Sequence, residues 1–227
     1  MLPLRRTFPT DAAFDEAWNG PSILPCAERG TFSEIAHFVA GGLAQEGFCL
    51  FANGGLPLIE RRRGPLWEEI VFVPSKDEAE FTVRFHLSHE GVGEVRGRYW
   101  RPASRAPKVV AAGDVAVMEP LPIRALWATA GHVRTAEAVL RTLADHVLPW
   151  FDLFDDPGLL RVRLGESSVP LVDPSTAVEL ILAEYGEREA RRFVRERSPV
   201  GRALAPEKGG YDLASDRLAT IAAYYRL

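Results

Sequence analysis

A basic stretch with aromatic residues inside it is the part of the sequence best suited to gripping a ligand. Residues 96–108 read RGRYWRPASRAPK, with four arginines, one lysine and no acidic residue. Basic side chains neutralise phosphate and aromatic rings stack on bases, so this combination is typical of a sequence-tolerant nucleic-acid groove. An ordinary solvated loop is the alternative, and the arginine-rich composition of the whole chain favours it. The candidate ligand-binding residues of this basic loop are Arg96, Arg98, Tyr99, Trp100 and Arg101.

Two histidines are candidates for hydrolysis or metal binding, because imidazole serves in both. His86 and His89 lie near the end of a predicted strand, and Glu90 and Glu94 follow them. Imidazole titrates near neutral pH and can serve as a general base, so a small hydrolase using both histidines is one alternative function. Residues three apart on a strand face opposite sides, however, which is poor geometry for two ligands of one metal ion. We retain His86 as a candidate ligand-binding residue.

The aspartate and glycine clusters of this sequence lack the spacing of known metal-binding and nucleotide-binding motifs. The aspartates within residues 152–156 do not follow the EF-hand pattern, and their place before Pro157 is typical of a turn that ends a helix. The glycine pairs follow neither the dinucleotide-binding nor the P-loop spacing. We therefore expect no cofactor, no metal and no catalytic residue, and the sequence favours a non-enzymatic protein.

Composition and charge indicate a globular protein and exclude a membrane-spanning one. The chain has 227 residues, 47% of them hydrophobic, which is enough for a large core, and its formal net charge is −4. No apolar run approaches the roughly 20 residues that cross a bilayer, and the start lacks the apolar core of a signal peptide. We expect a cytoplasmic protein without a membrane partner. Residues 1–60 and 111–172 carry more acidic than basic side chains, which suits a basic protein partner.

Residue periodicity predicts the elements that position these side chains. Helical spacing begins at Thr31 and ends near Gly47, and the strands that follow are separated by short turns, which favours an antiparallel meander. A fifth strand falls within residues 108–120, and helical patterns cover 123–130 and 132–151. The four strands of the predicted meander cover residues 48–52, 56–63, 66–74 and 79–88. Within it, Glu60, Glu68 and Glu69 are expected to pair with the arginines at 61–63.

In the last quarter of the chain the sequence pattern becomes helical. Asp173 and Pro174 are a typical helix start, Gly186 predicts a break, and a short amphipathic helix ends the chain after a linker rich in glycine and proline. The sequence therefore predicts an α+β domain over residues 1–172, with an antiparallel sheet of about five strands packed against helices, and a helical C-terminal extension over residues 173–227.

Several segments also resemble a known family. They are QEGFCLF, ERRRGPLWEEIVFVP, FTVRFHL, ALWATA and LPWFDLFDDPGLL, all within about residues 31–160. Together they resemble an uncharacterised bacterial family, the domain of unknown function numbered four-three-zero-four. This resemblance implies an α+β domain with an antiparallel sheet, no established activity, and a place among toxin and immunity systems.

The preferred hypothesis from the sequence is a non-enzymatic, cytoplasmic module that binds a protein partner, and an immunity protein is its most specific form. Nucleic-acid binding through the basic loop 96–108 and hydrolysis by His86 and His89 are the two alternatives.

Overall fold

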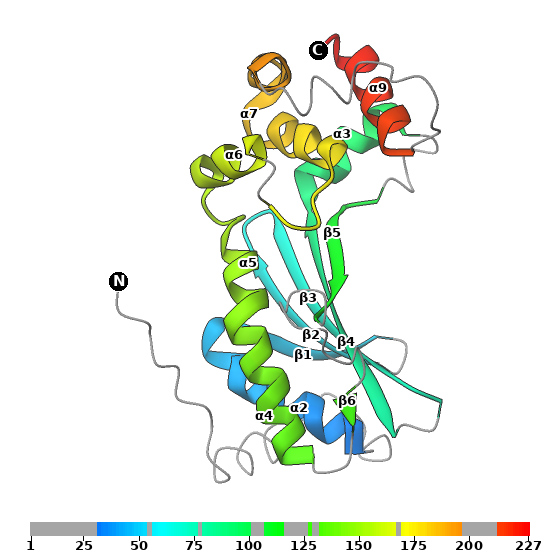
Figure 1. Ribbon diagram of the computed structural model, residues 1–227, viewed down its shortest axis with the longest axis vertical. Coiled ribbons are helices and arrows are strands. Elements are labelled where there is room, and N and C mark those ends of the chain that lie inside the picture. Colours follow the sequence, from blue (N-terminus) through cyan, green and yellow to red (C-terminus); the bar gives the residue numbers. More distant parts are fainter. Residues whose placement is uncertain are drawn as a thin grey trace. The chain divides into compact units, whose positions relative to one another are not determined.

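Alternation of apolar and polar residues builds one antiparallel sheet, as the sequence predicted (Figure 1). The strand order is β1-β2-β3-β4-β5, and β6 pairs with β4. The strands are β1 (Cys49–Asn53), β2 (Leu56–Arg63), β3 (Leu66–Pro74), β4 (Glu80–His89), β5 (Val109–Asp114) and β6 (Trp127–Ala128). The structure, a computed structural model, describes residues 31–53, 56–76, 79–100, 107–115, 127–128, 132–166, 169–196 and 213–227.

Strand β4 shows why the sheet has one buried face. The side chains of Phe81, Val83, Phe85 and Leu87 are fully buried, and the residues between them are half-buried or exposed. This period of two places every second side chain on the core face. The same face of the hairpin β2–β3 buries an ion pair between Arg61 and Glu68, whose Nε and Oε2 atoms are 2.6 Å apart.

Nine helical segments lie in the part of the chain that the structure describes. They are α2 (Thr31–Leu43), the 3-10 turn η2 (Ala44–Glu46), α3 (Glu90–Tyr99), α4 (His132–Thr142), the π-helical turn η5 (Leu143–Val147), α5 (Leu148–Asp152), α6 (Pro157–Gly165), α7 (Pro174–Glu196) and α9 (Leu213–Tyr225). Helices α2 and α4 lie side by side (Figure 1). Trp150 of α5 meets Phe85 of β4 edge to face, with ring centroids 5.2 Å apart, so this helix packs on the sheet.

The chain divides into two compact units. The first contains Met1–Arg62, Trp67–His86 and Gly113–Trp150, and the second contains Arg63–Leu66, Leu87–Ala112 and Phe151–Leu227. The predicted boundary after residue 172 does not coincide with this division, because α3 and α6 belong to the same unit as α7 and α9. No helix among the described residues is both long enough and apolar enough to cross a membrane.

Two local predictions were wrong. Residues 96–99 are not part of a loop, because they complete helix α3. The three glycines of this helix lower its intrinsic helix propensity and concealed it in the sequence. Close packing explains the glycine at position 91, since a Cβ there would lie 3.1 Å from the Cβ of Ala183. Trp127 was expected in a helix, but it pairs with Phe81 in the ladder between β6 and β4.

Helix α7 begins and bends as its sequence predicted. The Asp173 carboxylate accepts a hydrogen bond of 3.0 Å from the backbone N–H of Thr176, which caps the helix. Gly186 interrupts the helix with a φ of 78° and a ψ of −180°, a conformation that glycine adopts almost alone. The predicted linker before the last helix, the turn at Gly54 and the candidate residue Arg101 lie outside the described residues.

Candidate functional site

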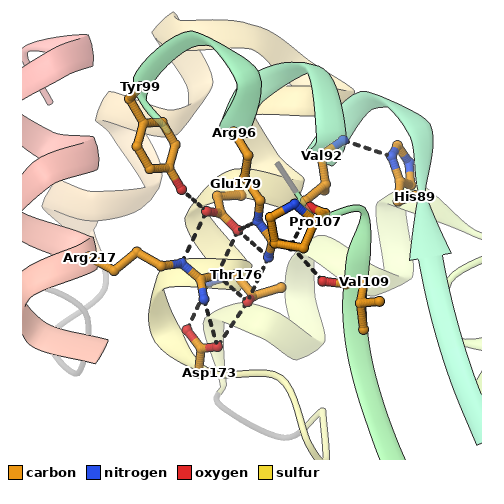
Figure 2. Close-up of polar contacts among 10 residues, drawn as sticks. All are labelled: His89, Val92, Arg96, Tyr99, Pro107, Val109, Asp173, Thr176, Glu179 and Arg217. Atoms are coloured by element: carbon orange, nitrogen blue, oxygen red, sulfur yellow. Dashed lines mark hydrogen bonds and ion pairs between the residues drawn. The ribbon is translucent and has the colours of Figure 1, made fainter. Parts of the chain in front are cut away.

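A buried carboxylate contacts two arginines and a tyrosine of the second unit. Glu179 of α7 is fully buried, and its Oε2 accepts hydrogen bonds from Arg96 at 2.6 and 2.9 Å (Figure 2). Arg217 of α9 donates to the same oxygen over 2.7 Å. The Tyr99 hydroxyl donates to the other carboxylate oxygen. We call these four residues the Glu179 cluster, and it joins helices α3, α7 and α9.

Further contacts complete the hydrogen bonding of the Glu179 cluster. Arg96 also donates to the backbone carbonyls of Pro107 and Val109, over 2.9 and 2.6 Å. Arg217 donates to the Thr176 hydroxyl over 2.6 Å, and that hydroxyl donates to Asp173. A buried ion pair is favourable only when hydrogen bonds satisfy its remaining groups, and here they do.

Burial and charge shift several pKa values around this cluster. Burial raises the pKa of Tyr99, and the hydrogen bond to Glu179 raises it further. Burial by itself would raise the pKa of Asp173, but the N–H of Thr176 and the charge of Arg217 outweigh it and lower that pKa. Burial opposes the charge of Arg217, yet the neighbouring Glu179 outweighs this and raises its pKa. Asp173 and Arg217 therefore stay ionised and matched near neutral pH.

The Glu179 cluster changes the role of two candidate ligand-binding residues. The Arg96 side chain is 3% exposed and its charge is matched by Glu179, so it is not placed to neutralise a phosphate. The Tyr99 hydroxyl likewise donates its hydrogen bond to Glu179 within the unit. Both residues hold α3 against α7 instead.

The neighbouring candidates remain at the surface. Arg98 is exposed, and Trp100, which follows the last turn of α3, is 37% exposed. Tyr224 of α9 is 52% exposed, and its ring centroid lies 6.5 Å from that of Tyr99. Burial raises the pKa of the adjacent Tyr225, and the Arg98 charge opposes this rise, so Arg98 lies near the end of α9. We use the name Trp100 surface for these three exposed residues, Arg98, Trp100 and Tyr224, which belong to the last turns of α3 and α9 or directly follow them.

The two histidines have different partners. His89 is buried, and its Nδ1 accepts a hydrogen bond from the backbone N–H of Val92, which caps α3. Its Nε2 therefore carries the hydrogen and donates to Glu184 over 2.6 Å. His86 is a third exposed, and its Nδ1 lies 3.8 Å from Glu69. In the described part of the chain no three His, Cys, Asp or Glu side chains form a group that could hold a metal ion.

His86 belongs to a line of polar residues that crosses neighbouring strands. Glu69 lies between His86 and Glu60, and Glu60 is paired with Cys49 in the register of β2 and β1. Burial raises the pKa of Glu60, and the charge of Glu69 adds to this effect. Two carboxylates so close on neighbouring strands repel each other, which costs stability.

The aspartates before α6 serve local structure. Asp152 and Asp155 both form ion pairs with Arg63, whose Nη1 atom lies 3.2 and 2.8 Å from their carboxylate oxygens. Asp156 accepts a hydrogen bond from the backbone N–H of Leu159 and caps α6. The predicted turn at the end of the preceding helix is therefore also the start of the next one.

A depression of about 330 Å³ lies between α6 and α7 in the second unit. Its charged side chains are already paired, because Arg161 contacts Glu189 at 3.0 Å and Arg192 contacts Glu196 at 2.7 Å. The lining residues that the structure describes therefore offer no unmatched charge to a ligand. Its lining residues are Gly158, Arg161, Val162, Tyr185, Arg192, Phe193 and Glu196.

Comparison of the chain with protein-family models, with curated proteins and with solved structures found no match. The site residues themselves are therefore the basis for a functional assignment. Sequence reasoning missed Glu179 and Tyr224. Glu179 had a readable signal, because it is the single charged residue in the run AVELIL, where an acid needs a buried partner.

Proposed function

We propose that this protein is a non-enzymatic, cytoplasmic bacterial module that binds a protein partner through the Trp100 surface. The observation that carries the proposal is the exposure of Arg98, Trp100 and Tyr224 where α3 and α9 end. Tryptophan, tyrosine and arginine are the residue types most enriched at binding hot spots, because they combine a large apolar contact area with polar groups.

The Glu179 cluster supports this proposal by fixing the helices that carry the surface. Arg96 and Tyr99 lie on α3 next to the exposed residues, and Arg217 lies on α9. A surface held in its binding conformation loses less conformational entropy on association. The buried charges thus favour binding without contacting the partner.

Two acidic segments of the chain, 1–60 and 111–172, suit a basic partner, whereas the Trp100 surface itself carries the positive charge of Arg98. The formal net charge is −4, and complementary fields speed and select association. A basic nuclease toxin is such a partner, so an immunity role is the specific form of the proposal.

The two alternatives have less support. Nucleic-acid binding is disfavoured because the charge of Arg96 is matched by Glu179 and cannot neutralise a phosphate. The Tyr99 hydroxyl also donates to that carboxylate, so it is not available to a ligand. Hydrolysis by the two histidines is disfavoured because His89 caps a helix and pairs with Glu184, whereas His86 faces Glu69.

A comparative capture experiment tests the proposal. The purified chain and its Trp100→Ala variant are immobilised and exposed to extract of the source cells, and retained proteins are quantified. Leu159→Ala is the matched control, because Leu159 is exposed to a similar degree, 41% against 37%, on α6 of the same unit. We expect a stoichiometric protein that wild type and control retain and Trp100→Ala loses. If all three retain the same proteins, or wild type retains only nucleic acid, the proposal fails.

A further inference from the structure

Helices α3 and α7 bring arginines to the end of α9 in the second unit. Arg191 of α7 donates to the backbone carbonyls of Tyr225 and Arg226, over 3.3 and 3.2 Å. Arg195, one turn further along α7, donates to the carbonyl of Arg191 over 3.2 Å. Arg98 of α3 lies near Tyr225, because burial raises the pKa of Tyr225 and the charge of Arg98 opposes this rise. We call Arg98, Arg191, Arg195 and Arg226 the Arg191 patch.

The Arg191 patch is open to solvent. Arg98, Arg195 and Arg226 are exposed, and the Arg191 side chain is 40% exposed. Among the described residues, only the carboxylate of Glu187 forms an ion pair with this patch, at 3.1 Å from Arg191. An exposed pair between residues four apart on a helix contributes little to stability, so the carboxylate of a ligand can replace Glu187 at low cost.

Other arginines of the second unit differ from this patch, because carboxylates of the chain match their charge. Arg96 and Arg217 share Glu179, and Arg161 pairs with Glu189. The formal net charge of the whole chain is −4. The Arg191 patch therefore concentrates positive charge at one exposed place on a chain that is acidic as a whole.

Helix geometry explains only part of this concentration. A cation near a helix C-terminus is favourable because the carbonyls there carry partial negative charge. That effect accounts for Arg98 near the end of α3, Arg195 near the end of α7 and Arg191 beside the last carbonyls of α9. It does not require the three arginines to meet around one exposed tyrosine.

The side chains at this place define the chemistry of a ligand. The planar guanidinium group of arginine matches a carboxylate with two parallel hydrogen bonds. The Tyr224 ring lies beside the patch, with its centroid 4.9 Å from that of Tyr225, and this residue is 52% exposed. A ligand that uses both features carries several carboxylates and an apolar group among them. A long polyanion such as nucleic acid is less suitable, because the acidic remainder of the chain repels it.

We infer that the Arg191 patch binds a short acidic segment of the protein partner, and that Tyr224 packs against an apolar residue of that segment. The identity of the ligand as part of the partner rests on the proposed function, because Arg98 and Tyr224 belong to the Trp100 surface. A partner that is basic over most of its surface meets the acidic segments of this chain and presents the acidic segment to the patch.

The probe is the peptide EELEELEE with an uncharged fluorophore, and its binding to the full-length chain is followed by fluorescence anisotropy. We expect saturable binding that weakens as salt is added, because exposed charges are screened. The neutral peptide QQLQQLQQ should not bind. In the double variant Arg98→Gln/Arg226→Gln we expect binding of EELEELEE to weaken by at least about tenfold, because two charge-assisted contacts are lost.

The control double variant Arg134→Gln/Arg163→Gln removes the same net charge at exposed positions of α4 and α6. It should bind EELEELEE like wild type. Equal weakening in both double variants would reduce the effect to net charge and overturn the inference. Absence of saturable binding to wild type at low salt would also overturn it, and so would tighter binding of an eight-nucleotide single-stranded DNA at the same arginines.

Backbone amide NMR of the wild-type chain covers the case in which a double variant does not fold. Addition of EELEELEE should shift the amide signals of Arg98 and of residues 224–227, and shifts confined to other residues contradict the inference. Peptide binding at the patch without a captured partner would refute the proposed function and leave the site intact. A captured partner without peptide binding would have the reverse meaning.

Discussion

The Nη2 atom of Arg217 lies 2.7 Å from the Oε2 atom of Glu179, and this pair fastens the last helix of the chain to a fully buried carboxylate. Arg96 approaches the same oxygen from α3 at 2.6 Å. One carboxylate thus joins three helices that are far apart in the sequence. Its two arginines differ in exposure, 3% for Arg96 and 24% for Arg217, which lets their roles be separated.

Replacing Arg96 should cost more stability than replacing Arg217. Arg96→Met removes the deepest partner of Glu179, and breaking a buried pair in this way costs about 3–5 kcal/mol. Arg217→Met should cost less, because Glu179 keeps Arg96 and Tyr99. Urea denaturation of both variants measures the difference in unfolding free energy. Equal losses, or a larger loss for Arg217→Met, would show that the cluster does not centre on the pair between α3 and α7.

Asp173 should make the second unit sensitive to acid. Its pKa is lowered in the folded state, so its contribution to stability is present above the unfolded pKa of about 3.9 and is lost as the pH falls through the folded value. Asp173→Asn keeps a side chain that can cap α7 but removes the charge. We expect the variant to be less stable than wild type at pH 7, and the two to converge at low pH. A difference independent of pH would exclude the charge as its cause.

Glu60 should behave in the opposite way. Its pKa is raised by burial and by Glu69, so folding favours its protonated form, and stability falls as the pH rises from the unfolded pKa of about 4.3 through the folded value. Glu60→Gln removes the repulsion and should raise the melting temperature at pH 7 by about 1–2 °C. The gain should vanish below pH 4 in thermal scans. A loss of stability at pH 7 would mean that Glu60 is held by an attractive contact.

Gly186 should resist substitution although its surroundings are open. A Cβ there would meet no atom within 4 Å, so the cost of Gly186→Ala comes from its backbone conformation alone. We expect a loss of about 1–3 kcal/mol in urea denaturation. Arg188→Gly, at a 94% exposed position in the regular part of the same helix, is the comparison for ordinary helix propensity. If Gly186→Ala is neutral, the bend of α7 does not require the glycine.

The sheet was predictable because its signal is local. Phe81, Val83, Phe85 and Leu87 alternate with polar residues, and only a strand gives that pattern one buried face. Helix α3 was not predictable in the same way, because its glycines hide the periodicity and its start depends on the cap from His89.

The functional roles within the basic loop depended on tertiary structure. Arg96 and Arg98 look equivalent in the sequence, but two positions on a helix differ by about 200° in direction, so one is buried and the other exposed. The partner that decides the role of Arg96, Glu179, lies 83 residues later in the chain. Only the apolar run AVELIL on both sides of Glu179 indicated that it needed a partner.

The central claim is that Trp100 contacts a protein partner, and site-specific photocrosslinking in the source cells tests it most directly. A benzophenone amino acid replaces Trp100 in one strain and Leu159, exposed on α6, in a control strain. The account predicts one covalent adduct with a protein after irradiation, formed from position 100 and absent from position 159. No adduct from position 100, or an adduct with nucleic acid alone, would contradict it.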